Sequence, residues 1–390
     1  MKIAIIQPTP FKKGHYFIYT KSLFNEIRKL KHHVRIISSS RTYTSFNREK
    51  KSKFDFNIYS LKGLVIYISL CFSTIFRFIV KRNSFNRIII LDCEYSCVSF
   101  LLLSLKLLKW KGKITLQVNS PNFDYDFSRE GFSTFRILKF IQSFIFRYSI
   151  NLLDLKISCL GKWHKNKLSQ QLSFSKEKIV IIEDGGGGDI DKLQEDNLLK
   201  KLKEESIVFP KKNKKIFLLF GNFRKDKGHL FLSKVWKKYF DNYDDPYLWI
   251  VGHDEEDISA SIFGLNAQNI IIHNCYVSIN LIGPIYQKAD FAILPYLSEY
   301  KGGSGPLMKG AFTNSKLALV SNVSEMGRLA TEERLGEAFE AESENSLIEC
   351  INRVLKNGPE YYYEKISNAN NYANQRNWKN LAKRFISSLE

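Results

Sequence analysis

A loop rich in glycine and serine in the last third of the chain has the residues needed to bind a phosphate ester. The sequence GGSG at 302–305 follows an apolar segment at 291–294, and Pro306 comes next. Proline favours the first turn of a helix, where the N–H that it lacks would have no partner within the helix. The first amides of a helix point outward at the positive end of its dipole, where anions bind. The expected anion-binding backbone is that of Gly303, Ser304, Gly305, Pro306 and Leu307. Taken alone, such a loop fits an ordinary strand-to-helix connection equally well.

A cluster of cations near the middle of the chain forms a second candidate site. Gly221 ends an apolar segment at 216–220, and Arg224 and Lys227 follow in the loop before Gly228. Arginine and lysine at the carboxyl end of the first strand of an α/β domain can neutralise a diphosphate. The alternative is a basic turn on the surface.

Both loops must be positioned by strands, and the apolar pattern predicts two sets of them. In the first half the expected strands are 2–7, 34–38, 87–91, 114–118, 155–158 and 179–182, and in the second half they are 216–220, 247–251, 270–273, 291–294 and 317–320. Helical periodicity separates them, and after residue 346 it continues to the end. Strands alternating with helices indicate parallel sheets wound on both faces. We therefore expect an α/β protein of two doubly wound, Rossmann-like domains that face each other across a cleft, where ligands of such sheets bind.

The regular alternation breaks between the two halves. Four consecutive glycines at 185–188 precede a charged segment at 193–205, which we expect to be helical, and a basic run at 211–215 follows. A domain boundary belongs there. The predicted division is a first domain at 1–190, a linker region at 191–215, a second domain at 216–370 and a final helical segment at 371–390.

The chain is strongly basic, with 59 Lys and Arg against 39 Asp and Glu and a net charge of +20. Such a charge attracts nucleic acid, anionic lipid or anionic substrates. Three segments at 61–82, 98–113 and 132–153 combine bulky apolar residues with Lys and Arg at helical spacing. We expect peripheral contact with an anionic membrane, although each segment alone also suits a core-facing helix with a basic outer side. No nucleic-acid-binding module is recognisable.

Cysteine content and hydropathy point to a cytoplasmic location. The six cysteines are scattered and lack metal-like spacing, so they are expected to be buried apolar residues in a reducing compartment and not disulfides or ligands. The longest apolar run, at 64–76, is shorter than the roughly 18 residues of a membrane span. The amino terminus, MKIAIIQPTP, has no signal-peptide cleavage site.

The order of motifs in the second half resembles the donor-binding domain of the GT-B glycosyltransferases of the retaining family 4 type. These motifs are GNFRKDKGHLFL from Gly221, YLWIVG from Tyr247, YQKADFAILPYLSEYKGGSGPLMKGAF from Tyr286 and LALVSN from Leu317. The resemblance implies that the first loop binds the pyrophosphate of a nucleotide sugar. Lys227 matches the family lysine, whereas Asn222 stands at the usual arginine and Arg224 is the nearest substitute. The family also has two glutamates around the later glycine loop. Glu299 is a candidate for the first, although it lies earlier than the family spacing requires, and Gly310 occupies the position of the second.

The first half resembles the acceptor domain of that family more loosely. Gly14 and His15 follow the first strand, where the resemblance implies that Gly14 contributes to donor binding and that His15 lines the cleft near the transferred sugar. His15 also suits a surface loop or a helix cap. Asn119 stands after the fourth strand, where relatives have a histidine, and it can hydrogen-bond but not exchange a proton. The sequences DYD at 124–126 and DID at 189–191 spell a short metal-binding signature of a different fold. We expect no metal at either and no bound cofactor, since family relatives stabilise the leaving diphosphate with cations and a helix end.

The resemblance implies a glycosyltransferase that moves a sugar, with retention, from a nucleotide-diphosphate-sugar donor to an acceptor. The predicted catalytic residues are His15, Asn119 and Glu299. The basic first domain favours a glycolipid or polysaccharide-precursor acceptor, such as that of lipopolysaccharide, at the inner face of a membrane. Two alternatives remain open, a nucleotide-sugar epimerase of the same architecture and a non-catalytic basic protein that binds nucleic acid.

Overall fold

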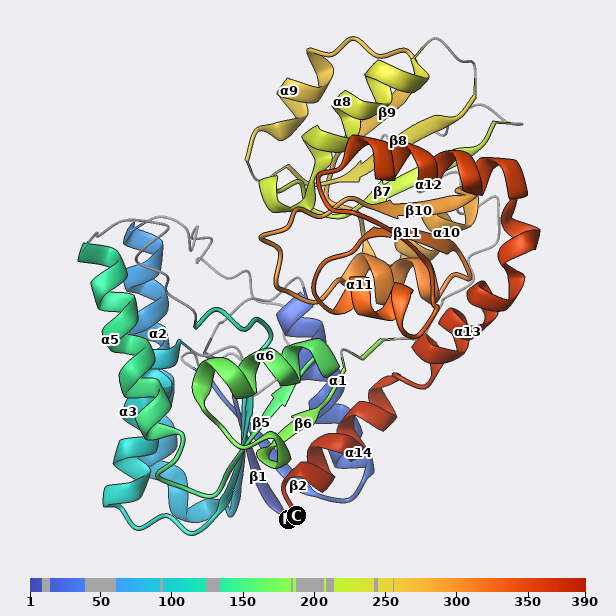
Figure 1. The fold of residues 1–390 in the computed structure, drawn as a ribbon. Coiled ribbons are helices and arrows are strands. Elements are labelled where there is room, and N and C mark those ends of the chain that lie inside the picture. The colour runs from blue at the N-terminus through green and yellow to red at the C-terminus, as the bar shows by residue number, and fades with distance from the viewer. Residues whose placement is uncertain are drawn as a thin grey trace. The chain divides into compact units, whose positions relative to one another are not determined.

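The computed structural model describes residues 1–8, 15–38, 61–91, 94–123, 134–183, 185–186, 207, 214–241, 245–254 and 256–390. The chain forms two compact units, one of Met1–Gly185 with Trp378–Glu390 and the other of Gly186–Asn377. Each is built on a parallel sheet of six described strands with helices on both faces (Figure 1). The prediction of two doubly wound α/β domains is confirmed.

The first unit has the strand order β2-β1-β3-β4-β5-β6. Its strands are β1 (Lys2–Ile6), β2 (His33–Ile37), β3 (Arg87–Ile90), β4 (Lys113–Gln117), β5 (Leu155–Cys159) and β6 (Ile179–Ile181). Its helices are α1 (His15–Lys29), α2 (Leu61–Lys81), α3 (Tyr95–Leu107), α5 (Thr134–Ser149), α6 (Lys162–Leu172) and α14 (Trp378–Ser388). Short 3₁₀ turns cover Arg82–Ser84 and Lys176–Lys178.

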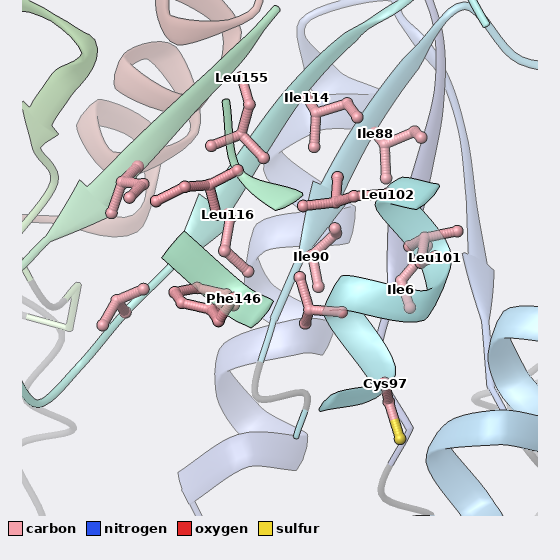
Figure 2. Packing of buried hydrophobic residues seen from close by; sticks show 14 of the residues in the cluster. Ile6, Ile88, Ile90, Cys97, Leu101, Leu102, Ile114, Leu116, Phe146 and Leu155 are labelled. Atoms are coloured by element: carbon pink, nitrogen blue, oxygen red, sulfur yellow. The ribbon is translucent and has the colours of Figure 1, made fainter. Parts of the chain in front are cut away.

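Side chains alternate between the two faces of this sheet, as strand geometry requires. Ile3, Ile5 and Ile89 pack with Leu23 of α1 and Phe385 of α14. The opposite face, seen in Figure 2, places Ile6, Ile88, Ile90 and Ile114 against Leu101 and Leu102 of α3. Both faces are apolar because helices cover both, which is why the strands are nearly continuous apolar runs.

The last helix joins the first unit through polar contacts as well as through this core. The Thr115 and Ser388 hydroxyls lie 2.7 Å apart in the interior, and Arg87 Nε donates to the Leu389 carbonyl at 2.7 Å. The chain therefore ends in the unit where it began.

The second unit has the strand order β12-β11-β10-β7-β8-β9. Its strands are β7 (Ile216–Phe220), β8 (Tyr247–Gly252), β9 (Ile270–Asn274), β10 (Phe291–Leu294), β11 (Leu317–Ser321) and β12 (Glu337–Phe339). Its helices are α8 (His229–Phe240), α9 (Ile258–Phe263), α10 (Ile279–Lys288), α11 (Ser324–Thr331), α12 (Glu344–Asn357) and α13 (Tyr363–Asn374). Shorter turns are η4 (Lys225–Lys227), η5 (Pro306–Phe312) and η6 (Pro359–Tyr362).

The predicted strands agree with the observed ones to within about a residue at each end. Strand β12 was not predicted, because it spans three residues and begins with a charged one. Its Glu337 is buried and pairs with Arg353 at 3.0 Å and with Lys365, so partners distant in the sequence allow the charge to enter the sheet. The predicted helix at 193–205 lies outside the described residues.

No helix in the described part of the chain has the length and apolar character to cross a membrane. Cys71, Cys97, Cys159, Cys275 and Cys350 are free thiols.

Candidate functional site in the second unit

The strand order of the second unit creates a place for a ligand at the carboxyl ends of β7 and β10. The chain starts at β7, continues outward on one side to β8 and β9, and then crosses to β10 on the other side. The loops after β7 and β10 therefore leave the sheet in opposite directions, and the crevice between such loops is where doubly wound sheets bind ligands. Both candidate phosphate loops found in the sequence begin at this point.

Close backbone approaches hold the loop after β7 in position. Gly221 has φ +124°, and its amide donates to the Val251 carbonyl at 2.9 Å. Gly228 has φ +69°, and a Cβ atom there would lie 1.9 Å from the Pro295 carbonyl oxygen. The amide of Leu297 donates to the Asp226 carbonyl at 2.9 Å. Glycine is needed at Gly228 both for its backbone conformation and because the two loops touch there.

Lys227 lies within this pair of loops. A Cβ atom placed on Gly221 would be 3.4 Å from Lys227 Nζ and 3.1 Å from Cγ of Pro306. The same ammonium lies 5.9 Å from the centre of the Tyr296 ring. The structure therefore brings the predicted lysine of the first loop beside the predicted anion-binding segment of the second.

Arg224 has a different environment. Its guanidinium forms a two-point ion pair with Asp226, in which Nε donates to Oδ1 at 3.0 Å and Nη2 donates to Oδ2. A carboxylate two residues away thus offsets the positive charge of Arg224. A role in holding a diphosphate stays a prediction for this residue.

Two tyrosines brace the glycine-rich loop after β10. Tyr296 and Tyr300 pack edge to face with ring centres 4.5 Å apart. The Tyr296 hydroxyl lies 3.2 Å from Ser304 Oγ, and the Tyr300 hydroxyl donates to the Gly303 carbonyl at 2.6 Å. Burial raises the pKa of Tyr300 to about 12 and that of Tyr296 well above its usual value, so both phenols stay protonated at neutral pH.

The segment after Pro306 differs from the expected helix. It is a π-helical turn of seven residues, Pro306–Phe312, with the proline in its first turn. The Leu307 amide donates to Ser304 Oγ at 3.2 Å, and the Leu307 side chain is buried in the core. Because the Leu307 amide has a partner within the loop, the outward amide expected at Leu307 is not available, and Pro306 has no N–H to offer. Gly303, Ser304 and Gly305 remain the backbone candidates.

The predicted acidic residue, Glu299, makes no hydrogen bond or ion pair that the described part of the site shows. Glu299 is exposed at the turn after Leu297. The carboxylate that engages the turn is instead Glu342, which accepts from the Ser298 amide at 3.1 Å and from its hydroxyl at 2.6 Å. These two hydrogen bonds lower the pKa of Glu342. The role proposed for Glu299 stays a prediction.

The residues predicted in the first unit are described only in part. Gly14 lies outside the described residues, as do both D-x-D sequences. His15 begins α1, but its side chain is not described. Asn119 follows β4, and its Oδ1 is buried with no hydrogen-bond partner among the described residues. The described residues also contain no cluster of three potential metal ligands.

Sequence reasoning missed Asp226 and the three tyrosines Tyr286, Tyr296 and Tyr300. Tyr296 and Tyr300 are four residues apart directly after Pro295, a spacing that could have suggested a pair packed within one turn. Nothing in the sequence indicated which loop atoms their hydroxyls would bind, because those contacts depend on the path of the loop.

Comparison with known proteins identifies the domain that carries this site. Residues 201–376 match the family model described as "Glycosyl transferases group 1". This part of the chain is similar to the glycosyl transferases group 1 family. The match covers β7 to β12 and therefore both loops of the site. No curated protein sequence matches the chain closely enough to count as a relative.

Solved structures extend the likeness from this domain to the whole chain. A glycosyltransferase from Rickettsia africae ESF-5 superposes with a TM-score of 0.71 at 18% identity, covering 99% of this chain and 97% of the other. Anabaena HepE in complex with UDP-glucose has a TM-score of 0.67 at 11% identity and covers 100% and 99%. WaaG, a glycosyltransferase involved in lipopolysaccharide biosynthesis, has a TM-score of 0.67 at 14% identity and covers 99% of both chains. At these identities the likeness establishes the fold, which is GT-B.

Proposed function

We propose that the protein is a glycosyltransferase that takes a sugar from a nucleotide-diphosphate-sugar donor and transfers it to an acceptor. The observation that supports this proposal best is the position of Lys227: its ammonium and the ring of Pro306 both lie next to Gly221, where the loops after β7 and β10 meet. A cation at the switch point of a doubly wound sheet suits a diphosphate. The match of this domain to the group 1 family model supports glycosyl transfer, and the UDP-glucose complex of HepE supports a nucleotide-sugar donor.

In the proposed reaction, the glycosidic bond to the diphosphate breaks and negative charge develops on the departing phosphate oxygen. Lys227 would stabilise this charge more in the transition state than in the bound donor, which lowers the barrier. The protonated hydroxyls of Tyr296 and Tyr300 hold the glycine-rich loop at that position. We propose retention of the anomeric configuration, with His15, Asn119 and Glu299 as the residues to test for contact with the transferred sugar.

For the acceptor, we propose a membrane-associated glycolipid or polysaccharide precursor at the cytoplasmic face of a membrane. The net charge of +20 supports attraction to an anionic membrane surface. The fold shared with WaaG, which is involved in lipopolysaccharide biosynthesis, is compatible with such an acceptor.

The donor proposal is tested by thermal shift with UDP-, GDP-, ADP- and CMP-sugars. At least one nucleoside-diphosphate sugar should raise the melting temperature, whereas a CMP-sugar, which has a single phosphate, should not. Lys227→Ala should abolish the shift. Lys225→Ala is the matched control, because Lys225 carries the same charge two residues away and is exposed. An undiminished shift in Lys227→Ala would refute the assignment of the diphosphate site.

Activity is tested separately by product analysis of purified protein with donor alone and with donor plus acceptor. Release of nucleoside diphosphate that depends on an acceptor supports transfer. Conversion of the sugar with donor alone, while the nucleotide remains attached, would instead identify an epimerase.

A further inference from the structure

Three neighbouring helices of the first unit expose most of the large apolar side chains that are exposed in the described part of the chain. On α2 they are Val65, Phe72, Phe76 and Val80, on α3 they are Phe100, Leu103 and Leu107, and on α5 they are Ile137, Phe140, Ile141, Phe144, Ile145 and Tyr148. We call these residues the three-helix apolar face. Patches of this extent on a water-exposed surface mark contact sites.

On each helix these residues form a stripe opposite the side that packs on the core. In α5, Ile137, Ile141, Phe144 and Tyr148 recur at helical spacing, whereas Phe146 points into the core beside the sheet (Figure 2). The helix therefore has two apolar sides: one packs against the sheet, and the other, the outward stripe, is exposed.

The stripes belong to one surface, because the helices pack side by side. Figure 1 shows α2, α3 and α5 together on the same side of the sheet. Phe72 of α2 meets Phe100 of α3 with ring centres 5.4 Å apart, so the first two stripes are continuous. The Ser149 hydroxyl of α5 lies 3.2 Å from that of Ser99 in α3, which joins the third helix to the second.

The charge on the same helices has one sign. The sequences of α2, α3 and α5 contain Lys and Arg but no Asp or Glu. Phe78 and Trp110 pack with ring centres 6.0 Å apart, which brings the carboxyl end of α2 to the segment after α3. The exposed lysines Lys81, Lys106 and Lys109 therefore gather at one end of the apolar face. A bulky apolar surface edged by cations matches an anionic lipid bilayer, whose headgroups bind the cations while the apolar side chains enter the acyl boundary.

We propose that the three-helix apolar face docks the protein onto the surface of an anionic bilayer. A second copy of the chain is a poorer occupant, because a two-fold contact would oppose the same basic residues of both copies. This proposal adds to the proposed function by naming the partner of the first unit. Docking would matter for catalysis only if the protein is the glycosyltransferase proposed above. Docking itself depends only on the face.

Co-sedimentation with vesicles tests the docking. The protein is mixed at low salt with vesicles of phosphatidylcholine and phosphatidylglycerol in equal parts, or with vesicles of phosphatidylcholine alone. The wild type should pellet with the mixed vesicles and far less with the neutral ones. The triple variant Phe76→Ser, Leu107→Ser and Phe144→Ser changes one residue on each helix. The exposed fractions of these residues are 67%, 83% and 67%. Its affinity should fall by roughly tenfold or more, because binding scales with the apolar area buried.

Two further variants make the result specific. Lys106→Glu with Lys109→Glu should remove the preference for phosphatidylglycerol. The matched control is the triple change Phe263→Ser, Tyr361→Ser and Tyr363→Ser, which removes side chains exposed by 58%, 71% and 75% in the second unit and should leave binding unchanged. The thermal shift with nucleotide sugar should be the same in all variants, so failure of docking can be distinguished from failure of the donor proposal.

The proposal is overturned if the wild type stays in the supernatant with mixed vesicles, or if the triple variant of the face binds as well as the wild type. It is also overturned if the wild type is a dimer that the triple variant of the face converts to a monomer without any change in vesicle binding, because the face would then be an interface between copies.

Discussion

The ring of Tyr286 occupies the space that a side chain at Gly310 would need. A Cβ atom on Gly310 would lie 2.2 Å from Cζ of Tyr286, and the Tyr286 hydroxyl donates to the Pro306 carbonyl at 2.9 Å. Tyr286 is buried, and burial raises the pKa of its hydroxyl, so it remains a donor at neutral pH. The tyrosine thus packs under the π-helical turn and excludes any larger residue at Gly310, the position at which the resembled family has its second glutamate.

Gly310→Ala should destabilise the protein by about 1–3 kcal/mol, because the added methyl group overpacks against a buried ring. In the background Tyr286→Leu the same substitution should cost less, since the ring that opposes the methyl group is gone. Urea unfolding of the two single variants and the double variant measures this coupling. Gly305→Ala is the control, because a Cβ atom there meets nothing within 4 Å. Additive effects of the Gly310 and Tyr286 changes would contradict the packing argument.

Gly228→Ala should disrupt the donor site. Its φ of +69° disfavours alanine, and the new Cβ atom would lie 1.9 Å from the Pro295 oxygen, so the two loops must separate. We expect a lower melting temperature and loss of the shift produced by nucleotide sugar. Gly264→Ala, where the nearest contacts are ordinary at 3.6 Å, should change neither. A Gly228→Ala protein with the wild-type nucleotide response would show that contact between the loops is not needed.

His229 should make the protein less stable in acid. Burial, together with the positive charge of Lys227, lowers its pKa to about 3 in the folded state, against 6.5 for the unperturbed side chain. Between these two values the unfolded chain binds a proton that the folded chain does not, so stability falls as the pH decreases through this window. Between pH 7 and pH 4.5 the free energy of unfolding should fall in both proteins. The fall should be smaller in His229→Gln than in the wild type by about 2–3 kcal/mol.

Chemical denaturation at the two pH values measures this difference. His33→Gln serves as the comparison, because His33 is an exposed histidine on β2. Equal losses on acidification in wild type and His229→Gln would argue against a buried neutral histidine at this position.

Arg328 and Glu325 form a buried ion pair on α11. Arg328 Nη2 donates to Glu325 Oε1 at 2.6 Å, and both side chains are less than a tenth exposed. Arg328→Met should cost about 3–5 kcal/mol, because it leaves the Glu325 carboxylate buried without its main partner. The double variant Arg328→Met with Glu325→Leu should recover much of this loss. Glu332→Gln, which removes an exposed partner of Arg328 at 3.4 Å, should cost under about 1 kcal/mol in the same unfolding experiment.

Features that depend on residues close together in the sequence could be predicted, whereas features that depend on residues far apart in the sequence could not. The strands were predictable because a strand buried between helices is a continuous apolar run, as in residues 216–220 and 291–294. Lys227 was predictable because its loop follows directly from a strand end. The π-helical turn after Pro306 was not, since proline signals the start of a helix and does not specify its hydrogen-bond pattern.

By itself, the sequence determined the α/β class, the two domains, the basic character of the first unit and the position of Lys227 after the first strand of the second. Each of these depends on local pattern or on composition. Only the tertiary structure decided that Arg224 pairs with Asp226, that Tyr286 excludes a side chain at Gly310 and that three apolar stripes share one surface. These relationships join residues whose neighbours are set by the path of loops and the packing of helices, and a local sequence pattern does not reveal that path.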